Sequence, residues 1–359
     1  MIVTKRQFEL AQLINMPSSN SYDSAFTAEE LIENGLAALA LENTLFTNDC
    51  ETLNTIRKVD QQLKIIHELQ FQQFKKLFKS LDEAKIPFVV LKGWALSYSV
   101  YPSPHQRPKT DIDIIISENY KSEIVAIFTR LNYTNPRGWE PRAIIDQFTM
   151  RKPIAKGINA SVDVHLKISD DKLIHQALSW EYIYSNTHTN KALSAKIPCK
   201  SLLIMHASVH LLHHYSHGDF VKLIWLYDIH LIIKECSESD ILKLVEMLSN
   251  TNLAKPVKRV IQDVLTILPS PKTQHILEQI DGIAGSPQFD YLLDEPSLVR
   301  SYIRKLNQTE GLRLKLAMLR EIFFPPKEEI FRKYGKVSTP MLPYYYILRI
   351  VSGTVRRLL

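Results

Sequence analysis

Hydrophobic and polar positions divide this chain of 359 residues into three parts. Residues 1–85 place apolar side chains at helical spacing, most clearly between Thr52 and Ala84. Residues 86–170 instead carry short apolar or alternating runs, which are typical of strands. Helical spacing returns over residues 171–359. The pattern predicts an α+β fold in which one small mixed sheet lies between helical N-terminal and C-terminal regions.

The segment from Ile86 to Ile116 is predicted to form a strand, a turn, a short helix, a loop and a second strand. The second strand begins with Asp111 and Asp113, and strand residues two apart share a face. Two carboxylates side by side repel each other and need a compensating cation. A hard, oxygen-binding metal such as Mg²⁺ (or Mn²⁺) suits them, so both residues are predicted metal ligands.

The first turn of this segment suits a phosphate group. Gly93 follows the first strand, where the lack of a side chain lets the backbone approach an anion. Lys92, Arg107 and Lys109 place positive charge near the same turn. A carboxylate pair beside such a cradle is the layout expected for phosphoryl or nucleotidyl transfer.

A third carboxylate stands on a later predicted strand, Ser161–Ile168, which a turn joins to a strand over Ile144–Met150. Asp163 and His165 alternate with apolar residues and therefore share one face. We interpret Asp163 as the third metal ligand and, with Asp111 and Asp113, as catalytic; the alternative is a surface residue on an edge strand. His165 is expected to bond a carboxylate or the substrate, or to be structural. The polar segment 137–142 is expected to loop over the site.

The sequence LKGWAL, followed by Tyr101, Arg107 and DIDIII, resembles the signature of an uncharacterised family of bacterial nucleotidyltransferases. That family is similar to the DNA polymerase beta-like superfamily. Val162–His165 resembles the family's Asp-x-His strand, and the stretch from His206 to Asp228 resembles its helical tail. Trp94 stands where the superfamily has Ser, so Lys92 is expected to make the phosphate contact instead. The resemblance implies a nucleotide site formed by Lys92, Gly93, Trp94, Arg107, Lys109, His165 and His210.

The resemblance also implies a reaction. A nucleoside monophosphate would move from an NTP to a hydroxyl or phosphate acceptor, with Mg²⁺ or Mn²⁺ as cofactor and pyrophosphate as the second product. The sequence leaves open whether the acceptor is a small molecule, a peptide or RNA. Two alternatives stay open as well: a catalytically silent nucleotide-binding or interaction module, and a toxin or defence nucleotidyltransferase that modifies RNA or protein.

Four histidines, His206, His210, His213 and His217, recur along one stripe of a predicted helix. Histidines four residues apart can bind zinc, but neither a cysteine nor an adjacent carboxylate completes a convincing set. We therefore expect a polar stripe that faces the nucleotide cleft. The family resemblance implies cleft or packing roles for His206, His210 and Asp228.

Charge and cysteine content set broader limits. The net charge of +6 permits contact with polyanions without requiring it. The cysteines Cys50, Cys199 and Cys236 are scattered, which indicates free thiols in a reducing cytoplasm. The N-terminus does not resemble a signal peptide, and no stretch reaches the roughly 18 apolar residues that a membrane span needs. We therefore expect a cytoplasmic protein.

The last predicted helix, Tyr344–Leu359, is apolar and carries Arg349, Arg356 and Arg357. Such a helix can lie on a membrane surface and make a weak contact with it. Because its charges are few, packing onto the helical C-terminal domain is the preferred interpretation.

Overall fold

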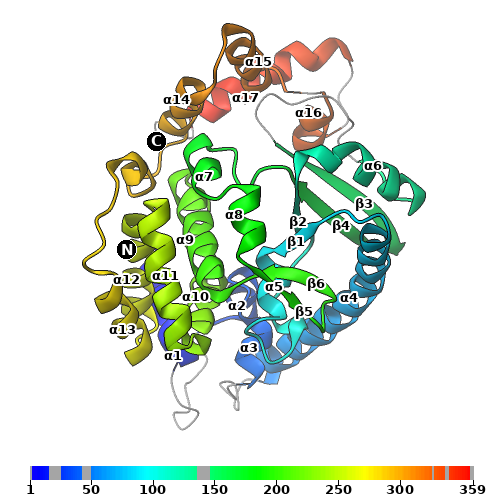
Figure 1. The fold of residues 1–359 in the computed structure, drawn as a ribbon. Helices are drawn as coiled ribbons and strands as arrows, with labels where there is room; N and C mark the ends of the chain where they lie inside the picture. The colour runs from blue at the N-terminus through cyan, green and yellow to red at the C-terminus, as the bar shows by residue number, and fades with distance from the viewer. Residues whose placement is uncertain are drawn as a thin grey trace.

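The computed structural model describes residues 2–15, 26–42, 50–135, 146–325, 327–335 and 339–355. A four-stranded sheet lies between groups of helices formed by the two ends of the chain (Figure 1). The predicted α+β class with a small mixed sheet is therefore confirmed. One apolar core contains side chains from all three parts of the chain. The boundaries at residues 85 and 170 stay predictions.

The sheet has the strand order β1-β2-β4-β3. β1 pairs with β2 and β3 pairs with β4 in antiparallel fashion, whereas the central strands β2 and β4 are parallel. The segment predicted to loop over the site, residues 137–142, lies outside the described residues. The strands are β1 (Phe88–Leu91), β2 (Ile112–Ile116), β3 (Gln147–Ala155) and β4 (Ile158–His165).

The register between β2 and β4 places Asp113 directly opposite Asp163. Neighbouring residues on each strand alternate between the two faces of the sheet. The apolar residues that flank the two carboxylates pair with each other and are completely buried, namely Ile112 with Val162 and Ile114 with Val164. Burial of these four side chains therefore fixes which face carries Asp113 and Asp163.

The N-terminal helices support the sheet. Thr27 begins α2 with a capping box, in which its hydroxyl accepts a hydrogen bond from the Glu30 amide and the Glu30 carboxylate accepts one from the Thr27 amide. In α4, the Gln70 amide donates to the carbonyls of Thr110 and Asn159, next to β2 and β4. The helices in this part are α1 (Lys5–Asn15), α2 (Ala28–Glu33), α3 (Ala37–Glu42) and α4 (Cys50–Glu83).

Helix α9 lies among α10, α11 and α12 in the C-terminal part (Figure 1). Within the described residues, no helix combines the length and the apolar character that crossing a membrane requires. The remaining helices are α5 (Lys92–Ser97), α6 (Lys121–Arg130), α7 (Lys172–Ala177), α8 (Trp180–Ser185), α9 (Lys200–Ser216), α10 (Leu223–Glu235), α11 (Glu238–Thr251), α12 (Ala254–Ile267), α13 (Pro271–Ile280), α14 (Leu298–Gln308), α15 (Leu312–Phe323), α16 (Lys327–Tyr334) and α17 (Leu342–Val355).

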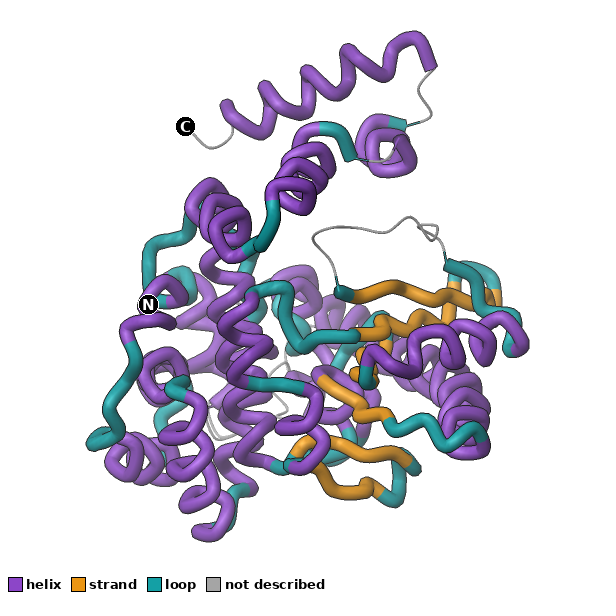
Figure 2. Tube along the Cα trace, turned by 45° about the horizontal axis from the view of Figure 1, so that its top comes forward, coloured by secondary structure: helices purple, strands orange, loops and turns teal. Residues whose placement is uncertain are grey.

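A hairpin interrupts the helices of the C-terminal part, so the helical pattern predicted over residues 171–359 does not hold for the two strands between residues 187 and 198 (Figure 2). Its strands, β5 (Thr187–Asn190) and β6 (Ala195–Pro198), form a separate two-stranded sheet, and β6 lies beside β1. Each strand has four residues, which is too short for an alternating pattern to stand out from the neighbouring helices.

Candidate functional site

Asp113 is the most enclosed of the three predicted catalytic carboxylates. Its Oδ1 atom accepts two hydrogen bonds, from Lys92 Nζ at 2.7 Å and from His165 Nε2 at 2.9 Å. Burial alone would raise the pKa of Asp113, but the Lys92 ammonium and the His165 hydrogen bond hold it well below its usual range. A lysine thus supplies part of the positive charge that the sequence assigns to a metal.

The pKa of Asp111 is shifted in the opposite direction from that of Asp113. Burial, followed by repulsion from Asp113 and Asp163, raises the pKa of Asp111 to about 6. Lys92 reduces this shift without cancelling it. Part of this shift is therefore repulsion between carboxylates, and an added cation would relieve that part.

Replacing Asp111 by Asn is expected to stabilise the metal-free protein at neutral pH. The pKa of this carboxyl is about 6 in the folded state and near 3.8 without the fold, so only the folded state keeps the proton between these values. Stability therefore falls as the pH rises from about 4 to about 6, and the amide removes that fall because it does not titrate. Urea unfolding with a chelator should show a gain of about 1–2 kcal/mol at pH 7. A variant that follows the wild-type pH curve would show that the fold does not raise the pKa of Asp111.

Asp163 lies on the same face as Asp113, as its parity predicts, and the parallel pairing of β2 with β4 makes the two residues neighbours. Thr149, on β3, donates a hydrogen bond from its hydroxyl to Asp163 Oδ1 at 2.7 Å. This contact leaves the second oxygen of Asp163 for other partners. The sequence gives no local signal for Thr149, because its position opposite Asp163 depends on the pairing of β3 with β4.

The turn between β1 and α5 brings Lys92 to the carboxylates. Lys92 has φ = 49°, in the left-handed region that non-glycine residues rarely adopt. The next residue, Gly93, packs closely against the loop that follows α5. A Cβ atom at Gly93 would lie 3.3 Å from Lys109 Cβ and 3.6 Å from Arg107 Nη1. The turn therefore has room for a glycine and little room for a larger residue.

Trp94 does not point toward the carboxylates. Its side chain is completely buried, with the indole stacked on His67 at a centroid distance of 4.7 Å and in edge contact with Phe74 at 4.9 Å. The buried indole is therefore not available to a nucleotide, and nucleotide binding by Trp94 stays a prediction that concerns its backbone.

Arg107 and Lys109 lie on the wall of the site, but other groups already use their polar atoms. Arg107 binds Asp228 through Nε and Nη2, with a closest distance of 2.8 Å, and Asp228 also accepts a 2.6 Å hydrogen bond from the Tyr101 hydroxyl. Lys109 Nζ donates to the carbonyls of Pro104 and Arg107. Burial, with Arg107 close by, holds the pKa of Lys109 well below its ordinary value. Nucleotide binding by Arg107 and Lys109 stays a prediction.

Two cavities meet at the carboxylate face. Lys92, Asp163, His206, His210 and His214 line both of them. The larger cavity has a volume of about 400 Å³ and is also lined by Gly93, Arg107, Lys109, Asp111, Asp113, Lys222, Trp225 and Asp228. The smaller cavity has a volume of about 320 Å³ and is also lined by Asp146, His165, Lys167, Ser169, Asp170 and His213.

The histidines of α9 separate the sheet from the other helices of the C-terminal part. His206, His210 and His213 line the cavities, as the predicted polar stripe requires. Burial, with Lys92 close by, lowers the pKa of His206 to about 3, so this imidazole is neutral. The predicted stripe does not include His214, although this residue follows His206 by eight residues and lies on the same helical face. Its Nε2 is 3.3 Å from that of His210. His217 bonds Ser301 instead.

The metal predictions depend on side chains that the structure brings together only in part. Of the residues it describes, no group of three or more His, Cys, Asp or Glu side chains is arranged to hold a metal ion. Asp111, Asp113 and Asp163 share one cavity, but Lys92 and His165 occupy one oxygen of Asp113. Cys199 and Cys236 are free thiols, as expected.

Comparisons with known proteins add a family. Residues 29–262, roughly two thirds of the chain, match the model of a family described as uncharacterised nucleotidyltransferase. Among solved structures, the chain is similar to the crystal structure of an antigenic nucleotidyltransferase-like protein from Paracoccidioides brasiliensis. The two sequences are 10% identical, the TM-score is 0.40, and the match covers 62% of this chain and 96% of the other. No curated protein matches the chain.

Proposed function

This chain belongs to the uncharacterised nucleotidyltransferase family, and from that premise we propose a divalent-metal-dependent transfer of a nucleoside monophosphate from an NTP to an acceptor. The family is the one that the motifs between Lys92 and Asp228 predict. One observation carries the proposal: Asp111, Asp113 and Asp163 all line one cavity, which begins at the Lys92–Gly93 turn. This arrangement puts carboxylates and a place for phosphate groups in the same space.

The larger cavity is the proposed NTP site. Gly93 lies at its wall, and a nucleotide phosphate could approach the backbone there because no side chain intervenes. Lys92 lines the same space and can offer its ammonium to a phosphate oxygen while it remains beside Asp113. The Trp225 ring, which also lines the cavity, offers a surface on which a base could stack.

The smaller cavity is the proposed acceptor site, because Asp163 belongs to both cavities. The acceptor oxygen attacks the α-phosphorus of the NTP and forms a new P–O bond. The bond from that phosphorus to the bridging oxygen breaks, and pyrophosphate leaves with the electron pair. The proton of an acceptor hydroxyl passes to the free oxygen of the Asp163 carboxylate, since Thr149 bonds the other one.

The residues present fit a divalent cation by their chemistry. Three carboxylates share the cavity, and repulsion from Asp113 and Asp163 adds to the effect of burial in raising the pKa of Asp111. Mg²⁺ or Mn²⁺ would be held by Asp111, Asp163 and the Asp113 oxygen that Lys92 and His165 leave open. When bound, such an ion neutralises phosphate charge and lowers the pKa of an acceptor hydroxyl. His165 holds Asp113 in place through its hydrogen bond.

Replacing Gly93 by Val should weaken NTP binding by about tenfold, which corresponds to about 1.4 kcal/mol. The new side chain would press on Lys109 and Arg107 and would keep phosphate away from the backbone. Calorimetric titration with a non-hydrolysable NTP analogue and Mg²⁺ measures the change. Gly282→Val is the matched control, because a Cβ there meets no atom within 4 Å and the backbone needs no positive φ. Equal affinity in both variants would place the triphosphate elsewhere.

The test of the proposed function is release of pyrophosphate from each of the four NTPs, with Mg²⁺ or Mn²⁺, and transfer of an α-phosphate label to an acceptor. Small-molecule, peptide and RNA fractions are offered separately. Transfer to one fraction that stops with a chelator supports the proposal and identifies the acceptor class. NTP binding without pyrophosphate release in any fraction would favour the catalytically silent module. Label on RNA or protein would keep the proposed reaction and assign it to the toxin or defence type.

A further inference from the structure

The C-terminal helices carry most of the large apolar side chains that the described residues expose. Three of them lie along one stripe of α15, where Leu312, Leu316 and Phe323 are 73%, 56% and 44% exposed. Their spacing of four and then seven residues keeps them on one face of the helix. On α14, Val299 and Ile303 form a second exposed stripe, 55% and 53% exposed. Exposed apolar stripes on consecutive helices indicate a contact surface.

Basic residues lie on both sides of the α15 stripe. At 3.6 residues per turn, Arg313 and Arg320 fall on one side of it and Lys315 on the other. Over the part of the chain that the structure describes, none of these three side chains has an ion-pair partner. From residue 298 onward the sequence has thirteen Lys and Arg against four Asp and Glu, an excess larger than the net charge of the whole chain. The rest of the chain is slightly acidic.

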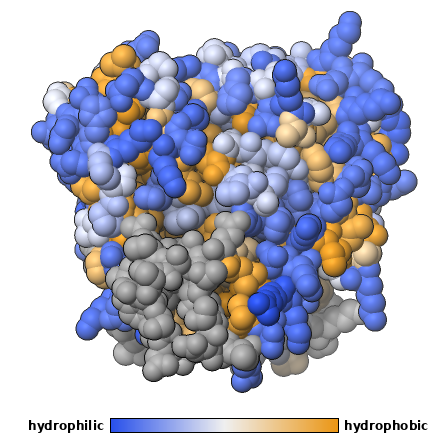
Figure 3. Space-filling view, turned by 90° about the horizontal axis from the view of Figure 1, so that it is seen from below, coloured by the Kyte–Doolittle hydropathy of each residue, from blue (hydrophilic) through white to orange (hydrophobic). Residues whose placement is uncertain are grey.

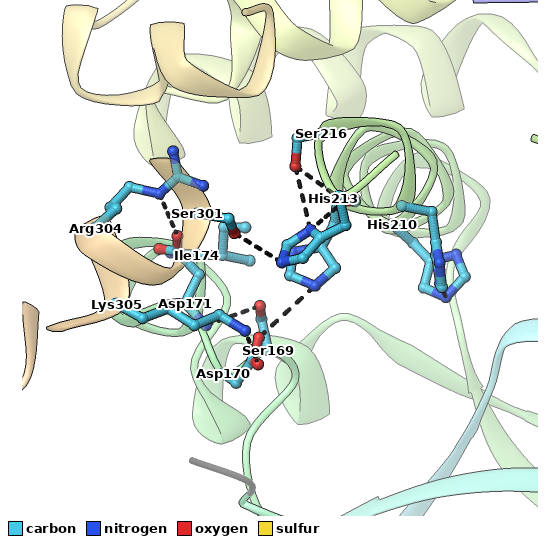
Figure 4. A network of polar contacts seen from close by, with 12 residues as sticks. Ser169, Asp170, Asp171, Ile174, His210, His213, Ser216, Ser301, Arg304 and Lys305 are labelled. Carbon is cyan, nitrogen blue, oxygen red and sulfur yellow. Dashed lines mark hydrogen bonds and ion pairs between the residues drawn. The ribbon is translucent and has the colours of Figure 1, made fainter. Parts of the chain in front are cut away.

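The inner face of α14 fixes this surface to the body of the protein. Ser301 bonds His217 Nε2 at 2.7 Å, Lys305 binds Asp170, and Arg304 pairs with Asp171 at 3.6 Å (Figure 4). These contacts use the side of α14 opposite Val299 and Ile303. The apolar stripe of α14 therefore stays free because the polar residues of the helix hold it in place.

The position of the helices is consistent with a docking role. α14, α15 and α17 lie together at one end of the molecule (Figures 1 and 2). The face seen from the opposite end is mostly hydrophilic outside its grey atoms (Figure 3). The match to the nucleotidyltransferase family ends at residue 262, so these helices lie outside the matched residues.

We propose that α14 and α15 dock onto an anionic lipid membrane, with Leu312, Leu316 and Phe323 among the acyl chains and Arg313, Lys315 and Arg320 against the lipid phosphates. An apolar stripe bordered by Lys and Arg is the pattern of a helix that lies in a membrane interface. A nucleic acid would contact the basic side chains but would leave the leucines in water. An acidic protein would not require an apolar stripe between the basic residues. The proposal is independent of the reaction.

This surface differs from the contact that the sequence predicts for the last helix. In α17, Arg349 Nη1 donates to the Ile322 carbonyl at 2.6 Å, and the Tyr346 hydroxyl donates to the Pro325 carbonyl at 2.8 Å. These bonds pack α17 against the end of α15, in agreement with the preferred interpretation. Arg356 and Arg357 lie outside the described residues.

The test is sedimentation of the full chain with two kinds of vesicle, phosphatidylcholine alone and phosphatidylcholine with an equal part of phosphatidylglycerol. We expect binding to the anionic vesicles to be at least about tenfold stronger and to weaken as salt rises. Leu312→Ser, Leu316→Ser and Phe323→Ser combined should abolish it. Neutralising Arg313, Lys315 and Arg320 with Gln should remove the preference for anionic lipid.

Ile65→Ser with Leu242→Ser is the matched control, because these side chains are 59% and 66% exposed on other helices. This variant should bind vesicles like the wild type. Equal binding of the control and the α15 variants, or no vesicle binding by the wild type, would overturn the proposal. The proposal would also be overturned if the α15 stripe held two copies of the chain together. Light scattering would then show a dimer that the triple serine variant of α15 converts to a monomer.

Discussion

Turnover should fall by about a thousandfold when Asp163 is replaced by Asn, while NTP affinity changes by less than about tenfold. The reason is the position of this residue. Asp163 is the one carboxylate of the three that lines both cavities, so in the proposed reaction it faces the acceptor as well as the nucleotide. Asn keeps the shape and can still accept the Thr149 hydrogen bond, but it cannot take a proton. Steady-state rates and calorimetric titration separate the two effects.

Asp146→Asn is the control for this variant. Asp146 lines the smaller cavity, is half-exposed and pairs with Lys167 at 2.7 Å. Loss of an exposed pair of this kind costs about 1 kcal/mol or less, so turnover should stay within a few-fold of the wild type. If Asp163→Asn kept turnover within a few-fold of the wild type, as Asp146→Asn should, the assignment of Asp163 as proton acceptor would be lost.

Asp228→Ala should destabilise the protein by about 3–5 kcal/mol, because it leaves the buried Arg107 guanidinium without a counter-charge. Arg107 and Asp228 are both buried, and Asp228 also receives the Tyr101 hydrogen bond. The pair joins the loop before β2 to α10, 121 residues later. Urea unfolding measures the loss. Activity should fall with it, since the same loop positions Lys109 against Gly93.

Two further variants show whether the unpaired Arg107 charge causes the loss of stability in Asp228→Ala. Asp290→Ala removes the partner of Lys255 on the surface, where both side chains are about half exposed, and should cost about 1 kcal/mol or less. Asp228→Ala combined with Arg107→Met removes both charges and should recover part of the lost stability. If the double variant is no more stable than Asp228→Ala alone, packing rather than charge accounts for the loss.

The sequence predicts what local periodicity determines. The period of two places Asp111 and Asp113 on one strand face and Asp163 and His165 on another, and the capping pattern at Thr27 marks the start of α2. None of this requires knowledge of distant contacts. The fold class and the strand-turn-helix order around Gly93 follow from the same local information, and the family follows from the resemblance of the motifs between Lys92 and Asp228.

The partners of these residues depend on contacts far apart in the chain. Nothing near Asp113 shows that Lys92 and His165 would share one of its oxygens, so the pattern treats Asp111 and Asp113 as equivalent, whereas the structure gives them opposite pKa shifts. Nothing near Arg107 shows that its guanidinium pairs with Asp228. Nothing near Trp94 shows that rings of α4 bury its indole.

The register of β2 and β4 also decides which side chains face the cavity in the folded protein. A slip of one residue would turn Asp163 toward the apolar side and bring Val162 and Val164 into the cavity. Such a chain would bury a carboxylate without a partner, at a cost large enough to prevent stable folding. We therefore expect a chain in that register to unfold rather than to persist as compact protein. The same valines that stabilise the sheet thus also disfavour any chain in which Asp163 turns away from the cavity.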